Sequence, residues 1–236
     1  MDIQQKLTGF AMMGATWIMW LLVALSVGGV AVAIERAVYL ISTSENVRRL
    51  KQQILALLRT GEVDEARARL SRSRSHVARI IAAALEDPSD GTASAEERMN
   101  GATQLAKLRM EKRLAFLGTL GSNAPFIGLL GTVIGIIRAF HQLNEAAGKV
   151  TSGLMSEVGE ALVATAIGIL VALPAIAFYN AFQRIIKARL ARAQAFGNEV
   201  LAVLKAEPSA RTPAPTLIPQ GRVHNGIAGN IQQVEA

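Results

Sequence analysis

Three polar side chains near the ends of two long apolar segments could line the path of a proton: Thr132, Glu160 and Thr165. Thr132 lies five residues inside the end of the uncharged segment 114–137, and Thr165 lies five residues beyond Glu160, which borders the uncharged segment 161–183. At a helical rise of 1.5 Å per residue, each hydroxyl is about 7.5 Å from its end. If the two segments form an antiparallel hairpin, the sequence therefore predicts that the hydroxyls share a level.

These side chains form an incomplete proton relay. A hydroxyl can hydrate a path but cannot hold a proton at physiological pH, and functional carboxylates normally lie well inside a membrane span. Glu35 and Glu160 lie at the edges of the apolar segments, and none of these segments has an acid in its middle. We therefore expect a partner protein to supply the missing membrane carboxylate.

The spacing of Glu160 and Thr165 raises a geometric question. Five residues correspond to about 140° around an ideal helix, so both side chains cannot point squarely into one pore. Either Glu160 precedes the regular helix, or one of the two residues faces a subunit interface. The sequence leaves both alternatives open.

Three uncharged segments must position these groups, at residues 10–34, 114–137 and 161–183. Each exceeds the roughly 20 residues that a helix needs to cross a bilayer. The first is also longer than the apolar region of a signal peptide, so we expect a retained span. The sequence predicts an all-α integral membrane protein with three transmembrane helices, whose long helices extend into a cytoplasmic helical domain.

The second and third spans carry small residues at helical spacing. Gly131 and Gly135 form a G-x-x-x-G step, which lets two helices approach closely in a membrane. A helix that faces only lipid has no use for such residues, so we expect the two spans to pack against other helices. The residues expected at these contacts are Pro125, Gly128, Gly131, Gly135, Gly168 and Pro174.

The distribution of basic residues predicts the orientation in the membrane. The chain has 25 Lys and Arg against 18 Asp and Glu, a net charge of +7, and 14 of the 25 lie in residues 42–113. Because basic residues mark cytoplasmic segments, we expect the N-terminus outside and the C-terminus in the cytoplasm. Beside the three spans, the predicted parts are a periplasmic segment 1–9, a cytoplasmic helical domain 35–113, a short periplasmic loop 138–160, a cytoplasmic helix 184–206 and a disordered proline-rich tail 207–236.

Turn and cap residues divide the predicted cytoplasmic domain into helices. Ser44 is positioned to cap the first, which the pair Thr60 and Gly61 should end. Residues 95–113 contain no helix breaker and are expected to continue directly into the second span. A basic cluster could bind anionic lipid or RNA, although a solvated face beside a membrane is the favoured interpretation. The cluster comprises Arg67, Arg69, Arg72, Arg74 and Arg79.

The composition argues against several other functions. Hydrophobic residues make up 51% of the chain and cysteine is absent, which excludes disulfides and thiolate metal sites. The glycine-rich stretch 128–135 contains no lysine and lies in an apolar segment, so it does not indicate a phosphate loop. We expect no enzyme activity, cofactor or metal. The alternative to a proton channel is a membrane scaffold, which explains the glycines but not the matched depth of Thr132 and Thr165.

Residues 121–140 and 159–180 carry a family resemblance. Their sequences, GSNAPFIGLLGTVIGIIRAF and GEALVATAIGILVALPAIAFYN, resemble the two-span signature of the MotA/TolQ/ExbB proton-channel family, closest to its ExbB and TolQ branches. By motif, Thr132, Glu160 and Thr165 occupy the places of the family's pore threonines and glutamate. For a channel subunit of this kind, we expect Glu160→Ala to impair function more than Glu157→Ala.

The same resemblance implies an assembly in the bacterial inner membrane. Family members form a homo-oligomeric ring, expected to be a pentamer, around an ExbD/TolR-like single-span partner whose membrane aspartate carries the proton. A TonB/TolA-like protein is a further partner that the resemblance implies. The ring would couple proton flow to TonB-dependent transport, Tol function or gliding motility.

Overall fold

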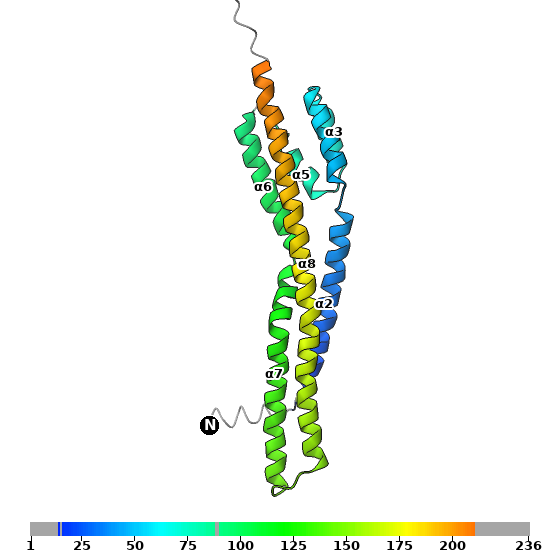
Figure 1. The fold of residues 1–236 in the computed structure, drawn as a ribbon, viewed down its shortest axis with the longest axis vertical. Coiled ribbons are helices and arrows are strands. Elements are labelled where there is room, and N and C mark those ends of the chain that lie inside the picture. Colours follow the sequence, from blue (N-terminus) through cyan, green and yellow to red (C-terminus); the bar gives the residue numbers. More distant parts are fainter. Residues whose placement is uncertain (1–13, 15, 88–89, 211–236) are drawn as a thin grey trace, which may run out of the picture.

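The computed structural model describes residue 14, residues 16–87 and residues 90–210. The predicted segment 1–9, most of residues 10–15 of the first predicted span, and residues 211–236 of the predicted tail lie outside the described residues. Every regular element that the structure describes is a helix (Figure 1). In chain order they are α2 (Thr16–Ser42), α3 (Val47–Arg59), α4 (Val63–Ser71), α5 (His76–Ala84), α6 (Gly91–Glu111), α7 (Leu114–Glu145) and α8 (Ser152–Ala210).

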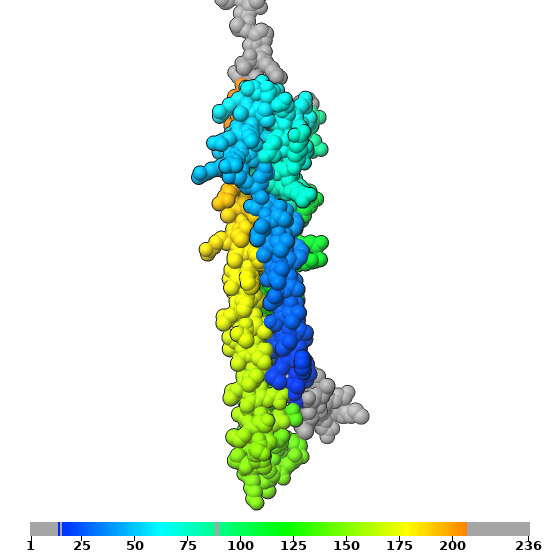
Figure 2. Space-filling view, turned by 90° about the vertical axis from the view of Figure 1, so that its right-hand side faces the viewer, coloured from blue at the N-terminus to red at the C-terminus, as the bar shows by residue number. Residues whose placement is uncertain are grey.

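Within this described part, three long helices are apolar enough to cross a membrane: α2, α7 and α8. This confirms the prediction of an all-helical chain with three candidate spans. The molecule is elongated because α8 runs along nearly its whole length (Figure 1). In the turned view, α2 lies along one side of α8 (Figure 2).

Helices α7 and α8 form the predicted antiparallel hairpin. They continue beyond the predicted spans, so only residues 146–151 of the expected loop 138–160 lie outside a helix. Ala147 and Gly148 make the turn with φ angles of 52° and 80°. One buried apolar cluster joins the hairpin to α2: Ile18, Leu22, Leu120, Ala124, Ile134, Val171, Ala172 and Ala175.

Helices α3, α5 and α6 pack against the end of α8 that lies away from the hairpin turn, and α4 packs against α3 and α5 (Figure 1). The expected cap of α3 is wrong: Asn46, rather than Ser44, accepts hydrogen bonds from the backbone N–H groups of Arg48 and Arg49. Asn46 immediately precedes the helix, where a short polar side chain reaches the first free donors. The predicted end of this helix is confirmed, since Thr60 follows its last residue and Gly61 has a φ of 82°.

The expected continuous helix from residue 95 into the second span is also wrong. Helix α6 ends at Glu111, and Arg113 has a left-handed φ of 64° just before α7 begins. Contacts with α2 stabilise the break: Glu35 pairs with Arg113 at 3.1 Å, and Arg36 Nη1 donates to the carbonyl oxygen of Arg109 at 3.4 Å. That carbonyl is one of those that a helix end leaves without an internal partner.

A buried histidine joins α2 to α5. His76 is 3% exposed, and its Nε2 lies 3.0 Å from the hydroxyl of Tyr39. Burial lowers the pKa of His76, and the positive charges of Arg79, Arg189 and Arg109 lower it further. The folded chain therefore favours neutral His76 more strongly than the unfolded chain does.

This environment predicts that mild acid destabilises the folded chain. Below the unfolded pKa of about 6.5 the unfolded state binds more protons, so stability falls with pH and the loss is complete below the folded pKa. Thermal unfolding of the detergent-purified protein should show this loss between pH 7 and pH 5.5. Replacing His76 with glutamine should flatten the pH dependence. Equal pH slopes in the two proteins would contradict the assignment.

Glu45 does not interfere in that pH range. Burial raises the pKa of Glu45, but hydrogen bonds from Ser73 and Arg69, together with the charge of Arg69, lower it overall. Its contribution to stability is therefore present above the unfolded value of 4.5 and is lost only as the pH falls through the folded value.

Candidate functional site

The hydroxyls of Thr132 and Thr165 meet between α7 and α8. The two Oγ1 atoms are hydrogen bonded, and both side chains are partly buried. Thr132 Oγ1 also lies 3.2 Å from the carbonyl oxygen of Ala161, and Thr165 Oγ1 lies 3.1 Å from that of Gly128. The antiparallel hairpin thus brings together the two groups that the sequence predicts at one level.

This pair has two hydrogen-bonding arrangements, because each hydroxyl has one proton and can also accept. In one, Thr132 donates to Thr165, which donates to the carbonyl of Gly128. In the other, Thr165 donates to Thr132, which donates to the carbonyl of Ala161 or, at 3.4 Å, to the carbonyl of Gly128 in its own helix. The pair can therefore reverse its direction of donation between the two helices, but it adds no group that stores a proton.

Glycines bring the two helix backbones into contact beside this pair. A Cβ added to Gly128 would lie 2.8 Å from the carbonyl oxygen of Ala164 and 3.0 Å from the Cα of Thr165. A Cβ on Gly168 would lie 2.7 Å from the carbonyl oxygen of Ala124. Since these neighbours are backbone atoms, hydroxyls on short side chains can reach across the contact.

Gly131 and Gly135 also lie where α7 contacts α8. A Cβ on Gly131 would lie 2.7 Å from the Cβ of Ala164, and one on Gly135 would lie 3.2 Å from the Cα of Ala161. Pro174 lines a small, mostly apolar cavity of about 60 Å³ between α2, α7 and α8. Pro125 is half-buried within α7.

Glu160 points away from the hydroxyl pair. It lies inside α8, which already begins at Ser152, so the alternative that Glu160 precedes the regular helix is wrong. Its Oε1 accepts a hydrogen bond of 2.6 Å from Thr16 of α2. Thr165 instead bonds across to α7, in agreement with the angle of about 140° that separates the two residues on a helix. The structure therefore connects Glu160 with α2.

A polar cluster that was not predicted from the sequence lies at the hairpin-turn end of the same helix contact. Glu157 is 9% exposed; its Oε1 forms an ion pair with Arg138 Nη2 at 2.9 Å and accepts a hydrogen bond from Gln142 Nε2 at 3.3 Å. A signal was present, because Arg138 follows the end of one span and Glu157 shortly precedes the other, so antiparallel pairing opposes them. Both residues fall within the predicted loop 138–160, most of which belongs to α7 and α8 in the structure.

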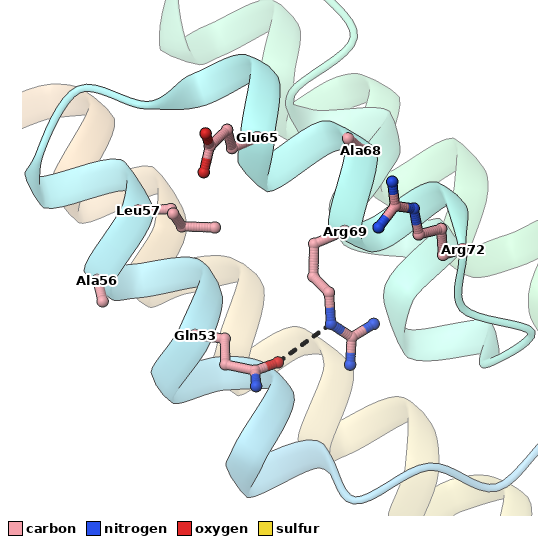
Figure 3. A pocket seen from close by; sticks show the side chains of 7 residues that line it. All are labelled: Gln53, Ala56, Leu57, Glu65, Ala68, Arg69 and Arg72. Carbon is pink, nitrogen blue, oxygen red and sulfur yellow. Dashed lines mark hydrogen bonds between the residues drawn. The ribbon is translucent and has the colours of Figure 1, made fainter.

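Two arginines of the basic cluster, Arg69 and Arg72, line an open groove between α3 and α4 (Figure 3). Arg69 reaches across this groove, donating from Nε to Gln53 at 3.1 Å and from Nη2 to Glu45 at 2.8 Å. These contacts connect parts of the helical domain, so Arg69 has a structural role. The groove is lined by Gln53, Ala56, Leu57, Glu65, Ala68, Arg69 and Arg72.

Several proteins of known family are similar to parts of this chain. It is 50% identical over 78 residues to a putative biopolymer transport protein ExbB-like 2 of Helicobacter pylori, a match covering 33% of this chain and 52% of that protein. It is 39% identical over 94 residues to the biopolymer transport protein ExbB of Aquifex aeolicus, covering 40% and 63%. It is 38% identical over 96 residues to the Tol-Pal system protein TolQ of Pseudomonas aeruginosa, covering 41% and 42%. The chain spans about half the length of the relatives it matches.

The family match covers more of the chain. Residues 72–195 match the MotA/TolQ/ExbB proton channel family. This range begins in the helical domain around α5 and contains α6, α7 and the part of α8 that forms the hairpin. It therefore includes both threonines, the glycine contact and the break before α7. The chain belongs to the MotA/TolQ/ExbB proton channel family.

Proposed function

We propose that this chain is the ring-forming subunit of a proton-driven motor in the bacterial inner membrane. The ring, a pentamer in this proposal, surrounds an ExbD/TolR-like single-span partner and couples proton flow to work on the cell envelope. The observation that carries the proposal is the hydrogen-bonded pair of Thr132 and Thr165 between two membrane-length helices. Channel and transport components of this family are not enzymes, which agrees with the absence of catalytic motifs in the sequence.

The proposed orientation places the hairpin turn of α7 and α8 outside the cytoplasm. The charge distribution supports it, because the helical domain at the other end carries most of the basic residues. In this orientation the N-terminus is outside and the C-terminus is in the cytoplasm. The names of two relatives, the Tol-Pal system protein TolQ and the biopolymer transport protein ExbB, support a role in a Tol-Pal system or in biopolymer transport. Gliding motility is the third system that we propose as a candidate.

Within the ring, we assign different roles to the three polar residues. Thr132 and Thr165 hydrate and orient the path, whereas the partner's membrane carboxylate carries the proton. Glu160 holds α2 against α8 through Thr16, and in this way fixes the position of α2 beside the path. Proton transfer then requires both the ring and the partner.

Reconstitution into liposomes tests this requirement. The purified chain alone should conduct protons poorly, and adding a single-span partner should raise the flux by about tenfold or more, since a positioned proton-transfer group contributes a factor of roughly 10² to 10⁴. The control is the same partner with its membrane aspartate replaced by asparagine, which should assemble without raising the flux. Robust flux from the chain alone would contradict the proposal.

The scaffold alternative makes a different prediction in cells. A scaffold that only oligomerises would support envelope functions whether or not a proton gradient is present. If the chain instead belongs to a proton-driven motor, a deletion phenotype that this chain rescues should reappear when an uncoupler collapses the gradient. Rescue that persists with the uncoupler would favour the scaffold.

A further inference from the structure

The contact between α7 and α8 ends in a buried ion pair next to the hairpin turn, and we propose that Arg138 and Glu157 form a latch that keeps Thr132 and Thr165 in register for proton transfer. The pair is 2.9 Å apart, with the Glu157 side chain 11% exposed and that of Arg138 26% exposed. Gln142 donates a hydrogen bond to the same carboxylate oxygen. The inference rests on the proposed function, because it assigns positioning residues for the same path.

The hydroxyl pair depends on such a latch because the rest of the contact offers few polar groups that could select one alignment. Between Gly128 and Gly135, apart from the two threonines, the helices meet mainly through glycine and alanine, which carry no polar side-chain atom. A slide by one residue would move one helix about 1.5 Å along the other, enough to break the 3.2 Å contact of Thr132 with the carbonyl of Ala161. Ala161 lies one turn from Glu157, so fixing Glu157 fixes that carbonyl.

The energetics of the pair also favour a role in register. Glu157 Oε2 is buried without a hydrogen-bond partner among the described residues, so the carboxylate is only partly compensated for its lost hydration. Well-packed apolar side chains would often be at least as stabilising as such a pair. A buried ion pair can nevertheless select one alignment of two helices, because any other alignment separates the charges.

Gly14, shortly before α2, leaves room for the Arg138 side chain of the latch. Gly14, with a φ of 86°, lies so close to the Arg138 guanidinium that an added Cβ would collide with it. A glycine in this conformation lets the chain pass the guanidinium without displacing it. The latch therefore joins α7 and α8 and lies beside Gly14, which shortly precedes α2.

Disulfide formation between two introduced cysteines measures the register directly. The chain has no native cysteine, so a full-length Thr132→Cys/Thr165→Cys protein reports only this contact. Mild oxidation of this protein in membranes should form the disulfide rapidly. Adding Glu157→Gln should slow the reaction by about tenfold, because the half-buried Arg138 then loses its opposite charge.

Conservative and reciprocal variants distinguish a latch from general damage to the fold. Arg138→Lys keeps the pair and should retain most of the rate, and Arg138→Glu combined with Glu157→Arg should restore it. Glu145→Gln is the matched control, since Glu145 is exposed at the same end of α7 and pairs only locally with His141. An unchanged rate in Glu157→Gln, or failure of both rescuing variants, would overturn the latch.

Proton flux in proteins with native threonines separates this inference from the proposed function. Glu157→Gln should lower partner-dependent flux per assembled ring, and the charge-reversed double variant should restore it. If Glu157→Gln slows disulfide formation but leaves partner-dependent flux unchanged, the alignment of the two hydroxyls does not control proton transfer and this inference fails, while the flux itself still supports the proposed function. Absence of partner-dependent flux in the unsubstituted protein would instead overturn the proposed function. If flux falls while disulfide formation is unchanged, the latch fails and the proposed function stands.

Discussion

Replacing both Thr132 and Thr165 with valine is expected to abolish proton-driven work while the ring still assembles. Valine keeps the shape and β-branching of threonine, so the packing of α7 on α8 should persist. Removing both hydroxyls together leaves no unpaired partner side chain, which makes the change nearly neutral for folding. Proton flux with the single-span partner present should fall by about 10²-fold or more, which is the lower end of what one positioned proton-transfer group contributes.

Size-exclusion chromatography and flux measurements on the same preparation test this expectation. Thr→Ser at both positions should retain activity, because it restores the hydroxyls without the methyl groups. Thr103→Val is the matched control, since the Thr103 hydroxyl bonds to the carbonyl of Met99 within its own helix α6. A fully active double valine protein would remove Thr132 and Thr165 from the path.

Replacing Gly168 with alanine is expected to disrupt the hairpin, with a loss of stability of about 1–3 kcal/mol or more. The added Cβ would lie 2.7 Å from the carbonyl oxygen of Ala124 and 3.0 Å from the Cα of Gly128, both of them backbone atoms. Neither atom can move without displacing helix α7. Gly128→Ala should have a similar effect, because its Cβ meets the backbone of Ala164 and Thr165.

Gly159 provides the control on the same helix. An added Cβ there has no neighbour within 4 Å, so Gly159→Ala should be neutral or stabilising by up to about 1 kcal/mol through helix propensity. The two substitutions in α8 are therefore expected to differ in sign. Thermal unfolding in detergent, together with the yield of assembled ring, measures the difference. Equal stability of the Gly168→Ala and Gly159→Ala proteins would contradict the close backbone contact.

The sequence by itself determined the features that depend on local composition. The apolar lengths predict three membrane-length helices, and the antiparallel hairpin follows from two such segments joined by a short polar stretch. Once the hairpin is assumed, counting residues from its ends places Thr132 opposite Thr165, because helical rise is constant. The end of α3 shortly before Gly61 was equally predictable, since glycine adopts a positive φ without strain.

Only the tertiary structure decided the features that depend on residues distant in the chain. Lys112 and Arg113 carry no local breaker signal, and the break between α6 and α7 is held by Glu35 and Arg36 of α2. Glu160 turns toward Thr16, and Arg138 pairs with Glu157, because folding places these partners beside one another. A long polar side chain can adopt several directions, and the one it adopts is set by the groups that neighbouring helices bring within hydrogen-bonding reach.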